Sequence, residues 1–474
     1  MWLASACSEF KHCTGFDILL QHVAVGAIHD AAERFNPPRC HPGTRVAAQN
    51  KIKSWVEAPV REYPILWLNG LMGAGKSAIA QMIAEYFNDK SRRYLLATFI
   101  FSRGAGDRNN ERFFVATIAY QLALSLPQLR PLIERAVEDD PLLFSKSLRT
   151  QLSTLIIDPL QSVSGSMGVE QQKVMPRLIL IDGLDECQGS KVQESILMLL
   201  VTLAQQQPIP LAIFIASRPE PTIRETFDIG ILNQLSTRIT LDTSYKPDED
   251  IQKFLIEEFA RVRERHESVA KLQFPLVWPT TNVINTLLVK SSGQFIYPSV
   301  VVKFVGSIHY NPISRLDIIC GLASGYEFEN PYAELDVLFL HILSCVKQHH
   351  LRSALRMIGF KLAALAVRPV TYPQFKVDRM ETLLETVGMM EVLMSLKAGD
   401  SSYILADLSS LISIDDSGVL NLMHASLGEF LVDRSRSGDY HIDLASAHAD
   451  ILCCFIKYVE LLEGRLDVKK IFIV

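Results

Sequence analysis

The chain has 474 residues, of which 48% are hydrophobic and 21% are charged, and its formal net charge is −5. This length suits roughly two to four domains with apolar cores of their own. The acidic balance speaks against a general affinity for nucleic acid or anionic membranes. Eight cysteines are spread without a C-x-x-C pair, which favours reduced thiols over a disulfide framework.

The sequence shows no membrane or export segment. A membrane helix needs roughly 18 consecutive apolar residues, and the longest apolar run, 196–204, has polar flanks that suit a core helix. The N-terminus lacks a basic region followed by an apolar core, so we predict no secretory signal. We therefore expect a cytoplasmic protein.

The first 45 residues are expected to form a helical segment. Apolar residues from Phe16 to Ile28 recur at helical spacing, and the pattern ends at Asn36-Pro37-Pro38. Two interpretations stay open: a packing extension of the next domain, or the remnant of a segment that binds a partner. Cys40 and His41 are adjacent, but a pair without further ligands does not make a zinc site, so we predict no metal there.

Residues 70–77, GLMGAGKS, follow an apolar run at 65–68 and have the form G-x-x-x-x-G-K-[ST] of a phosphate-binding P-loop. Glycines let backbone N–H groups approach a polyphosphate, and the next helix points its positive end at it. A glycine-rich turn with an incidental lysine is the plain alternative, which the flanking strand and helix patterns disfavour. The predicted nucleotide-binding residues are Gly70, Leu71, Met72, Gly73, Ala74, Gly75, Lys76, Ser77 and Ala78.

A second strand is predicted at 94–101, followed by a glycine-rich loop at 102–108. Ligands bind at the carboxyl ends of strands in open α/β sheets, so Arg103 or Arg108 either faces the γ-phosphate or is a solvated surface arginine. Helices are expected next at 113–126, 128–137 and 148–160. The polar stretch 161–173 is interpreted as a surface loop.

Acidic residues follow the apolar run at 178–181. Four apolar residues in a row indicate a central parallel strand. Asp182 at its carboxyl end is predicted to hold Mg²⁺ together with the Ser77 hydroxyl. Asp185 and Glu186 lie where a carboxylate orients or deprotonates an attacking water. The plain alternative is a buried strand that ends in an ordinary acidic turn.

A further strand at 211–216 ends in Ser217-Arg218-Pro219, and another follows at 235–241. A hydroxyl and a cation at a strand end are suited to sensing a γ-phosphate, which makes Arg218 a candidate. We expect Pro219 to be the first residue of the next helix. Strands that alternate with helices predict a doubly wound parallel sheet.

Several motifs together resemble the NACHT domain of the signal-transduction ATPases with numerous domains (STAND), and in particular fungal NACHT proteins of the nephrocystin-3-like N-terminal type. The resemblance covers about residues 40–451. It implies that Asp182 binds magnesium, that Asp185 and Glu186 form the distal acidic pair, and that Arg218 is the sensor. The motifs are CHPGTR (40–45), GLMGAGKS (70–77), FIFSRGAGDR (99–108), TIAYQLA (117–123), LILIDGLDEC (178–187) and IFIASRPEP (213–221).

After residue 245 the pattern becomes helical, and the resemblance implies a helical domain followed by a winged-helix-like domain. Two apolar runs, 410–414 and 419–423, flank a turn and predict a β-hairpin. His424 resembles the histidine of a Met-His-Asp motif, which implies a contact with the β-phosphate of ADP, although Ala425 replaces the aspartate. A buried structural histidine is the alternative. No basic recognition helix is evident, so we do not expect nucleic-acid binding.

The expected architecture is an α/β P-loop NTPase domain followed by an all-α helical domain and a winged-helix-like domain. The predicted boundaries are 1–45 for the N-terminal helical segment, 46–242 for the nucleotide-binding domain, 243–325 for the helical domain, 326–445 for the winged-helix-like domain and 446–474 for a tail of one helix and an apolar stub.

The function implied by the resemblance is an ATP/ADP- and Mg²⁺-binding switch in signalling, with slow ATP hydrolysis and homo-oligomers in the ATP state. Its biological setting would be non-self recognition or regulated cell death in fungi, with protein partners that the sequence does not identify. Two alternatives remain: a nucleotide-loaded interaction scaffold without significant hydrolysis, and a P-loop kinase, which the long helical extension disfavours. The preference for ATP over GTP rests on the resemblance alone.

Overall fold

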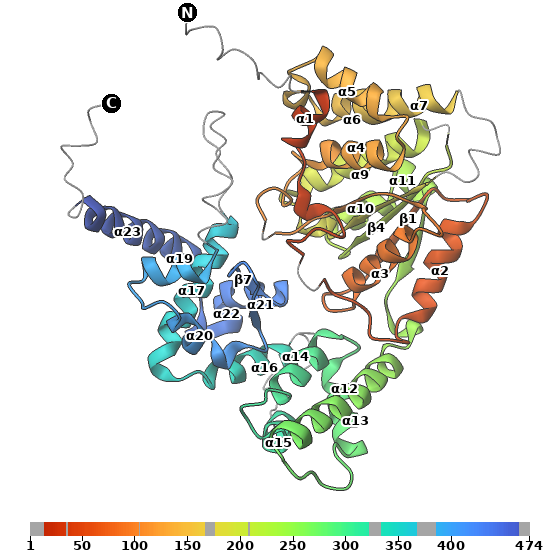
Figure 1. Cartoon of the computed structure of the whole chain (residues 1–474). Helices are drawn as coiled ribbons and strands as arrows, with labels where there is room; N and C mark the ends of the chain where they lie inside the picture. Colours follow the sequence, from red (N-terminus) through yellow and green to blue (C-terminus); the bar gives the residue numbers. More distant parts are fainter. Residues whose placement is uncertain are drawn as a thin grey trace, which may run out of the picture. The chain divides into compact units, whose positions relative to one another are not determined.

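The computed structural model describes residues 14–34, 37–103, 105–165, 176–206, 209–321, 333–366 and 385–463, and Figure 1 follows the chain through them. The chain packs as two compact units. The first comprises residues 1–71 and 75–245, and the second comprises 72–74 and 246–474. Within the described residues, no helix has both the length and the apolar character needed to cross a membrane.

The first unit is built on a five-stranded sheet with the order β2-β3-β4-β1-β5. Every neighbouring pair of strands is parallel, so the predicted parallel sheet is confirmed. All residues of β1 to β4 are buried, which explains why these strands read as continuous apolar runs. The strands are β1 (Ile65–Asn69), β2 (Leu95–Ile100), β3 (Leu178–Asp182), β4 (Ala212–Ser217) and β5 (Ser236–Thr240).

Helices lie on both faces of this sheet (Figure 1). Alternate strand residues such as Ile179 and Ile181 join one large apolar core with residues of α4, α5 and α9, as the period of two in a strand requires. The helices are α1 (Gly15–Leu20), α2 (Val46–Glu57), α3 (Lys76–Asn88), α4 (Phe114–Ser125), α5 (Arg130–Asp139), α6 (Leu148–Leu152), α7 (Asp158–Ser164), α9 (Ser190–Gln206), α10 (Pro221–Asp228) and α11 (Gly230–Leu235).

Two expectations for this unit were wrong. The helix after β4 begins at Pro221, not at Pro219, and Glu220 is its N-cap. Either proline fits a first helical position because that position needs no N–H donor, so the sequence rule could not choose between them. Residues 161–164 belong to α7 rather than to a surface loop. The rest of that predicted loop, 166–173, lies outside the described residues, as do residues 1–13 and the apolar stub at 464–474.

The strand register places the carboxyl ends of β1, β3 and β4 side by side at one edge of the sheet. Asn69 of β1 pairs with Ser217 of β4, and Asp182 of β3 pairs with Ala216 of β4. β4 therefore lies between the strand that enters the P-loop and the strand that carries Asp182. Ser217 and Arg218, at the carboxyl end of β4, consequently lie between the P-loop and Asp182 at this edge of the sheet.

The buried indole of Trp67 fixes this alignment. Its Nε1–H donates to the Ser217 hydroxyl over 2.8 Å, and its ring stacks on Phe227 with a centroid distance of 4.1 Å. We expect Ser217→Ala to lower the free energy of unfolding by about 1–3 kcal/mol, because the indole N–H would lose its acceptor in the core. Urea denaturation, followed through the unfolding transition of the first unit, measures this change in free energy. The exposed Ser195 on α9 provides the control, and Ser195→Ala should change stability by less than about 0.5 kcal/mol.

The second unit is helical apart from one hairpin. Its helices share an apolar core in which Phe339 and Phe430 lie 5.3 Å apart between ring centroids. The helices are α12 (Pro247–Val269), α13 (Thr281–Ser291), α14 (Ile296–Val305), α15 (Pro312–Gly321), α16 (Ala333–Ser344), α17 (Gln348–Ala366), α19 (Val387–Leu393), α20 (Asp400–Ile404), α21 (Ala425–Val432), α22 (Arg434–Ser437) and α23 (Leu444–Glu463).

The predicted hairpin is confirmed. β6 (Ile412–Ile414) pairs antiparallel with β7 (Leu420–Leu422). Asp415 closes the turn because its Oδ1 accepts from the backbone N–H groups of Ser417 and Val419, at 3.0 and 2.9 Å. The winged-helix character of this region stays a prediction.

Candidate nucleotide-binding site

The P-loop lies between β1 and α3, and its glycines have the backbone that the motif requires. Gly73 has φ +77° and Gly75 has φ +91°, in the left-handed region that side chains disfavour. Gly75 is the N-cap of α3, which begins at Lys76. Of the predicted loop residues, 72–74 pack with the second unit, so the geometry below concerns Gly70, Leu71 and residues 75–78.

The Lys76 side chain turns back along this loop. Its Nζ donates to the carbonyl oxygens of Gly70 and Leu71, at 2.8 and 3.0 Å. Burial lowers the pKa of Lys76 to about 8, and the Asp185 carboxylate offsets part of that shift. The ammonium group is therefore held where the charge is poorly solvated, and a bound anion would favour its charged form.

Ser77 and Asp182 come together as the sequence predicts. The Ser77 Oγ donates to the Asp182 Oδ1 over 3.3 Å. Asp182 is only 3% exposed, and burial raises its pKa to about 6, while Arg34 and the Ser77 hydrogen bond pull it back. Because burial disfavours the charged form of this carboxylate, a cation beside it would be favourable.

These two residues fit Mg²⁺. Magnesium prefers oxygen ligands and keeps several waters, and in P-loop sites it is held by a hydroxyl, a strand-end aspartate and phosphate oxygens. Across the described residues, no three His, Cys, Asp or Glu side chains form a metal cluster. A divalent ion at this site would therefore depend on Ser77, Asp182, water and the nucleotide itself.

Asp185 is bound to Arg218 on the neighbouring strand end. The Arg218 backbone N–H donates to Asp185 Oδ1 over 2.9 Å, and its Nε lies 3.2 Å from Oδ2. Both carboxylate oxygens of Asp185 are thus engaged, which fixes the Arg218 guanidinium close to the sheet edge. This geometry suits Asp185 to positioning Arg218 rather than to accepting a proton.

Glu186 has the properties of a proton acceptor. Burial, and then the nearby Asp185, raise its pKa to about 7, while the Arg103 backbone N–H donates to its Oε2 over 3.2 Å. A base is most effective when its pKa is near the working pH. The structure thus gives the two acids of the predicted pair different environments.

The two loop arginines after β2 have separate roles. Arg103 reaches the acidic pair, with Nη2 3.4 Å from the backbone oxygen of Asp185. Arg108 instead donates to the carbonyl oxygen of Gly26 in the N-terminal segment. Arg103 is exposed and Arg108 is partly buried, and a contact with the γ-phosphate stays a prediction for both.

Three residues near the site had no predicted role. Arg45, in the left-handed region at φ +54°, is 4% exposed, and its Nε would lie 4.0 Å from a Cβ placed on Gly75. Gln81 lies one helical turn after Ser77, and Arg34 donates to its Oε1 over 2.8 Å. A signal for Gln81 exists in the sequence, because Ser77, Gln81 and Glu85 recur at a spacing of four and share one face of α3.

His424 lies in the second unit, at the N-cap of α21. Among the described residues, its Nε2 has no hydrogen-bond partner. Burial, and then the positive charge of Lys303, lower its pKa to about 4. The neutral form is therefore strongly favoured, and its contact with ADP stays a prediction.

The lowered pKa of His424 predicts a loss of stability in acid. The unfolded chain would take up a proton near the usual histidine pKa of about 6.5, whereas the folded chain resists it until about pH 4, so stability falls as the pH drops through this window. At pH 5 the loss is on the order of 2 kcal/mol. Thermal unfolding at pH 7 and pH 5 should show a larger decrease for the wild type than for His424→Gln. Equal decreases in both proteins would contradict the expectation.

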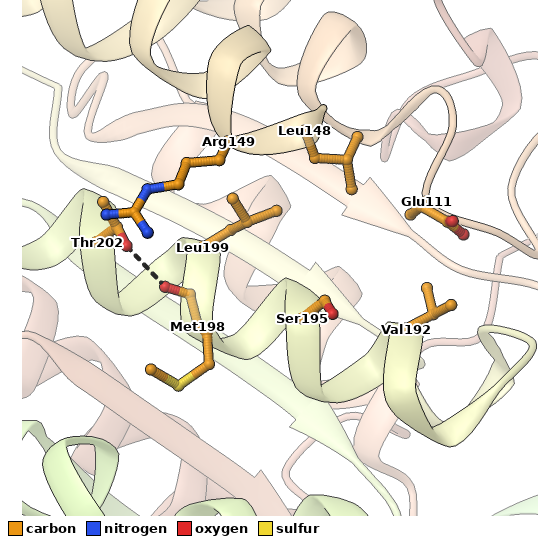
Figure 2. Close-up of a pocket in the computed structure, with 8 residues that line it drawn as sticks. All are labelled: Glu111, Leu148, Arg149, Val192, Ser195, Met198, Leu199 and Thr202. Atoms are coloured by element: carbon orange, nitrogen blue, oxygen red, sulfur yellow. Dashed lines mark hydrogen bonds between the residues drawn. The ribbon is translucent and has the colours of Figure 1, made fainter. Parts of the chain in front are cut away.

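A separate shallow pocket of about 390 Å³ opens between α6 and α9 (Figure 2). Figure 2 shows Arg149 and Leu148 facing Thr202, Leu199 and Ser195 across it. None of the residues that line it belongs to the P-loop or to the acidic pair. This pocket is therefore not part of the candidate nucleotide site.

Comparison with known proteins gives one family match. Residues 43–218 match the family model described as nephrocystin 3, N-terminal. This segment contains the P-loop, Asp182, the acidic pair and Arg218, but less than half of the chain. No curated protein matches the chain.

Similar solved structures are distant. A STAND protein with a tetratricopeptide repeat sensor from Pyrococcus horikoshii has a TM-score of 0.44 and 14% identity over 89% of this chain, and the chain spans about half (46%) of that protein. Cdc6p from Pyrobaculum aerophilum has a TM-score of 0.36 and 12% identity over 89% of this chain and 96% of its own. Drosophila ORC bound to DNA has a TM-score of 0.32 and 11% identity over 81% of this chain and 92% of the matched one.

Structural likenesses at this level carry no argument about function. The sheet, the glycine-rich loop ahead of α3 and the match over 43–218 stand independently of them. The chain therefore contains a P-loop NTPase-like α/β fold, whose segment 43–218 is similar to the nephrocystin 3 N-terminal family.

Proposed function

We propose that the chain is an ATP/ADP-binding, Mg²⁺-dependent signal-transduction NTPase of the NACHT type within the STAND proteins, acting as a nucleotide-controlled switch. The observation that carries the proposal is the Ser77 hydroxyl at 3.3 Å from Asp182, immediately after the P-loop lysine. A hydroxyl, a lysine and a strand-end carboxylate in this order bind the phosphates and metal of a nucleoside triphosphate in P-loop proteins.

Each residue has a defined task in this proposal. Lys76 would exchange the carbonyls of Gly70 and Leu71 for the β- and γ-phosphates, whose negative charge would raise its lowered pKa. Ser77 and Asp182 would hold Mg²⁺, which would supply positive charge beside the phosphate oxygens. Arg218, oriented by Asp185, faces the γ-phosphate.

Hydrolysis is assigned to Glu186. Its carboxylate accepts a proton from the attacking water, for which a pKa of about 7 is suitable. The hydrogen bond from the Arg103 backbone N–H holds this carboxylate near the start of the loop after β2. We expect slow turnover that resets the switch.

The switch operates through different affinities of two conformations for ATP and ADP. ADP would stabilise a resting state with His424 at the β-phosphate, and ATP would favour a state that forms homo-oligomers. Support comes from the match of 43–218 to the nephrocystin 3 N-terminal family. We propose a cytoplasmic setting in fungal non-self recognition or regulated cell death.

The experiment combines hydrolysis with assembly. ATPase activity and size-exclusion elution are measured with MgATP and with MgADP for the wild type, Lys76→Ala and Asp185→Ala/Glu186→Ala. The switch requires slow hydrolysis, lost in both variants, and a larger assembly with ATP than with ADP. Binding without hydrolysis and with equal elution in both nucleotides would instead support an interaction scaffold.

A further inference from the structure

The N-terminal segment 14–34 lies outside the family match yet is anchored beside the nucleotide site. The Ala24 N–H donates to the Thr117 hydroxyl over 2.9 Å, and the His29 N–H donates to the Thr98 hydroxyl over 3.0 Å. Both threonines are fully buried, in α4 and β2. These bonds fix the path of the segment along the first unit.

The segment meets α3 along a row of polar residues that begins at the metal site. Ser77, Gln81 and Glu85 are spaced by four and share one helix face. At the near end, Arg34 Nη1 donates to Gln81 Oε1 over 2.8 Å. At the far end, Arg39 donates to Glu85 over 2.8 and 3.1 Å.

A polar cavity of about 620 Å³ lies between the segment and α3 and is lined by both arginines, Gln81 and Glu85. Gln81 is itself held, because its Nε2 donates to Glu85 Oε1 over 2.9 Å and to the His29 carbonyl over 3.1 Å. Arg34 is thus fixed one helical turn from Ser77, whereas Arg39 is fixed two turns away.

The electrostatics agree with this placement. Burial lowers the pKa of Arg34, and Asp182 is the charge that opposes this most. In turn, Arg34 is the strongest influence that lowers the pKa of Asp182 against burial. Arg39 differs from Arg34 in its surroundings: it pairs with Glu85, and its side chain is largely exposed.

We propose that Arg34 is a positioning cation of the nucleotide site, and that its fixed charge beside the Ser77–Asp182 pair favours the γ-phosphate and hence ATP over ADP. The inference rests on the proposed function, since it assumes that Ser77 and Asp182 would hold Mg²⁺ beside the phosphates of the nucleotide. Arg34 is partly buried, and the charge of a partly buried group is screened less than that of an exposed one. Arg34 need not touch the nucleotide to act in this way.

The test compares affinities for MgATP and MgADP by isothermal titration calorimetry. Variants that remove the charge, Arg34→Gln and Arg34→Met, should weaken MgATP binding about 3- to 10-fold and MgADP binding less than about 2-fold. Arg34→Lys should keep the wild-type ratio of the two affinities within about 2-fold. Arg39→Gln removes a cation from the same cavity and should leave both affinities unchanged.

Any of three binding results would overturn the inference: an unchanged affinity ratio in both charge-removing variants, an equal shift of the ratio in Arg39→Gln, or an Arg34→Lys variant that shifts the ratio as far as Arg34→Gln does. Circular dichroism and thermal unfolding accompany every variant, and loss of folding in both charge-removing variants would assign Arg34 a structural role and also overturn it. A wild type that binds neither nucleotide would mark failure of the proposed function itself.

Discussion

Replacing Lys76 with alanine should weaken MgATP binding about 100-fold. The lysine supplies the charge that meets the β- and γ-phosphates, and hydrogen bonds between charged groups contribute about 1.5–3 kcal/mol each. The carbonyl oxygens of Gly70 and Leu71, which accept from the Lys76 ammonium, offer no substitute cation. Calorimetric titration of MgATP into both proteins measures the effect.

The same variant should not be less stable without nucleotide. The lowered pKa of Lys76 means that burial disfavours its charged form, so removal of the side chain relieves a cost of the folded state. Thermal unfolding of nucleotide-free Lys76→Ala should occur at or above the wild-type temperature. Lys51→Ala, on the exposed face of α2, should leave both affinity and stability unchanged. An ATP affinity within about threefold of the wild type would exclude Lys76 from the phosphate site.

Glu186→Gln should lower the rate of ATP hydrolysis about 10²- to 10⁴-fold, the range lost with a general base. The amide keeps the size of the side chain but cannot accept the proton of the attacking water. Because Ser77, Asp182 and Lys76 are untouched, MgATP affinity should stay within about threefold of the wild type. Single-turnover phosphate release and calorimetric binding separate the two quantities.

Asp185→Asn provides the comparison with the neighbouring acid. Its carboxylate orients Arg218 through the backbone N–H and Nε, so its loss should act on binding of the γ-phosphate as well as on hydrolysis. Glu111→Gln, at the pocket between α6 and α9, should change neither. If Glu186→Gln hydrolyses ATP at the wild-type rate, the base must be sought elsewhere.

Much of the fold could be predicted because the informative signals are local. The apolar runs at 65–68, 178–181 and 211–216 each became a buried strand, and the glycines at 73 and 75 have the positive φ angles that their motif requires. The meeting of Ser77 with Asp182 also followed, since parallel strands place their carboxyl ends at one edge of a sheet.

The order of the strands could not be predicted in this way. A run such as 211–216 shows that a strand is buried, but the crossover connections decide which neighbours it has. Arg34 was missed for a related reason. Its link to the site passes through Gln81 on α3, and no spacing in the sequence connects residue 34 to residue 182. Pro219 was misassigned because Pro221 satisfies the same helix-start rule.

The insertion of β4 between β1 and β3 places the backbone of one strand between the P-loop strand and the strand of Asp182. Phe214, at the middle of β4, pairs with Leu66 on one side and Leu180 on the other. Backbone hydrogen bonds set this separation at ~4.8 Å per strand, and side chains point to the faces of the sheet rather than between strands. Divergent copies of such a domain can thus exchange one apolar side chain of β4 for another while the P-loop and Asp182 keep their separation.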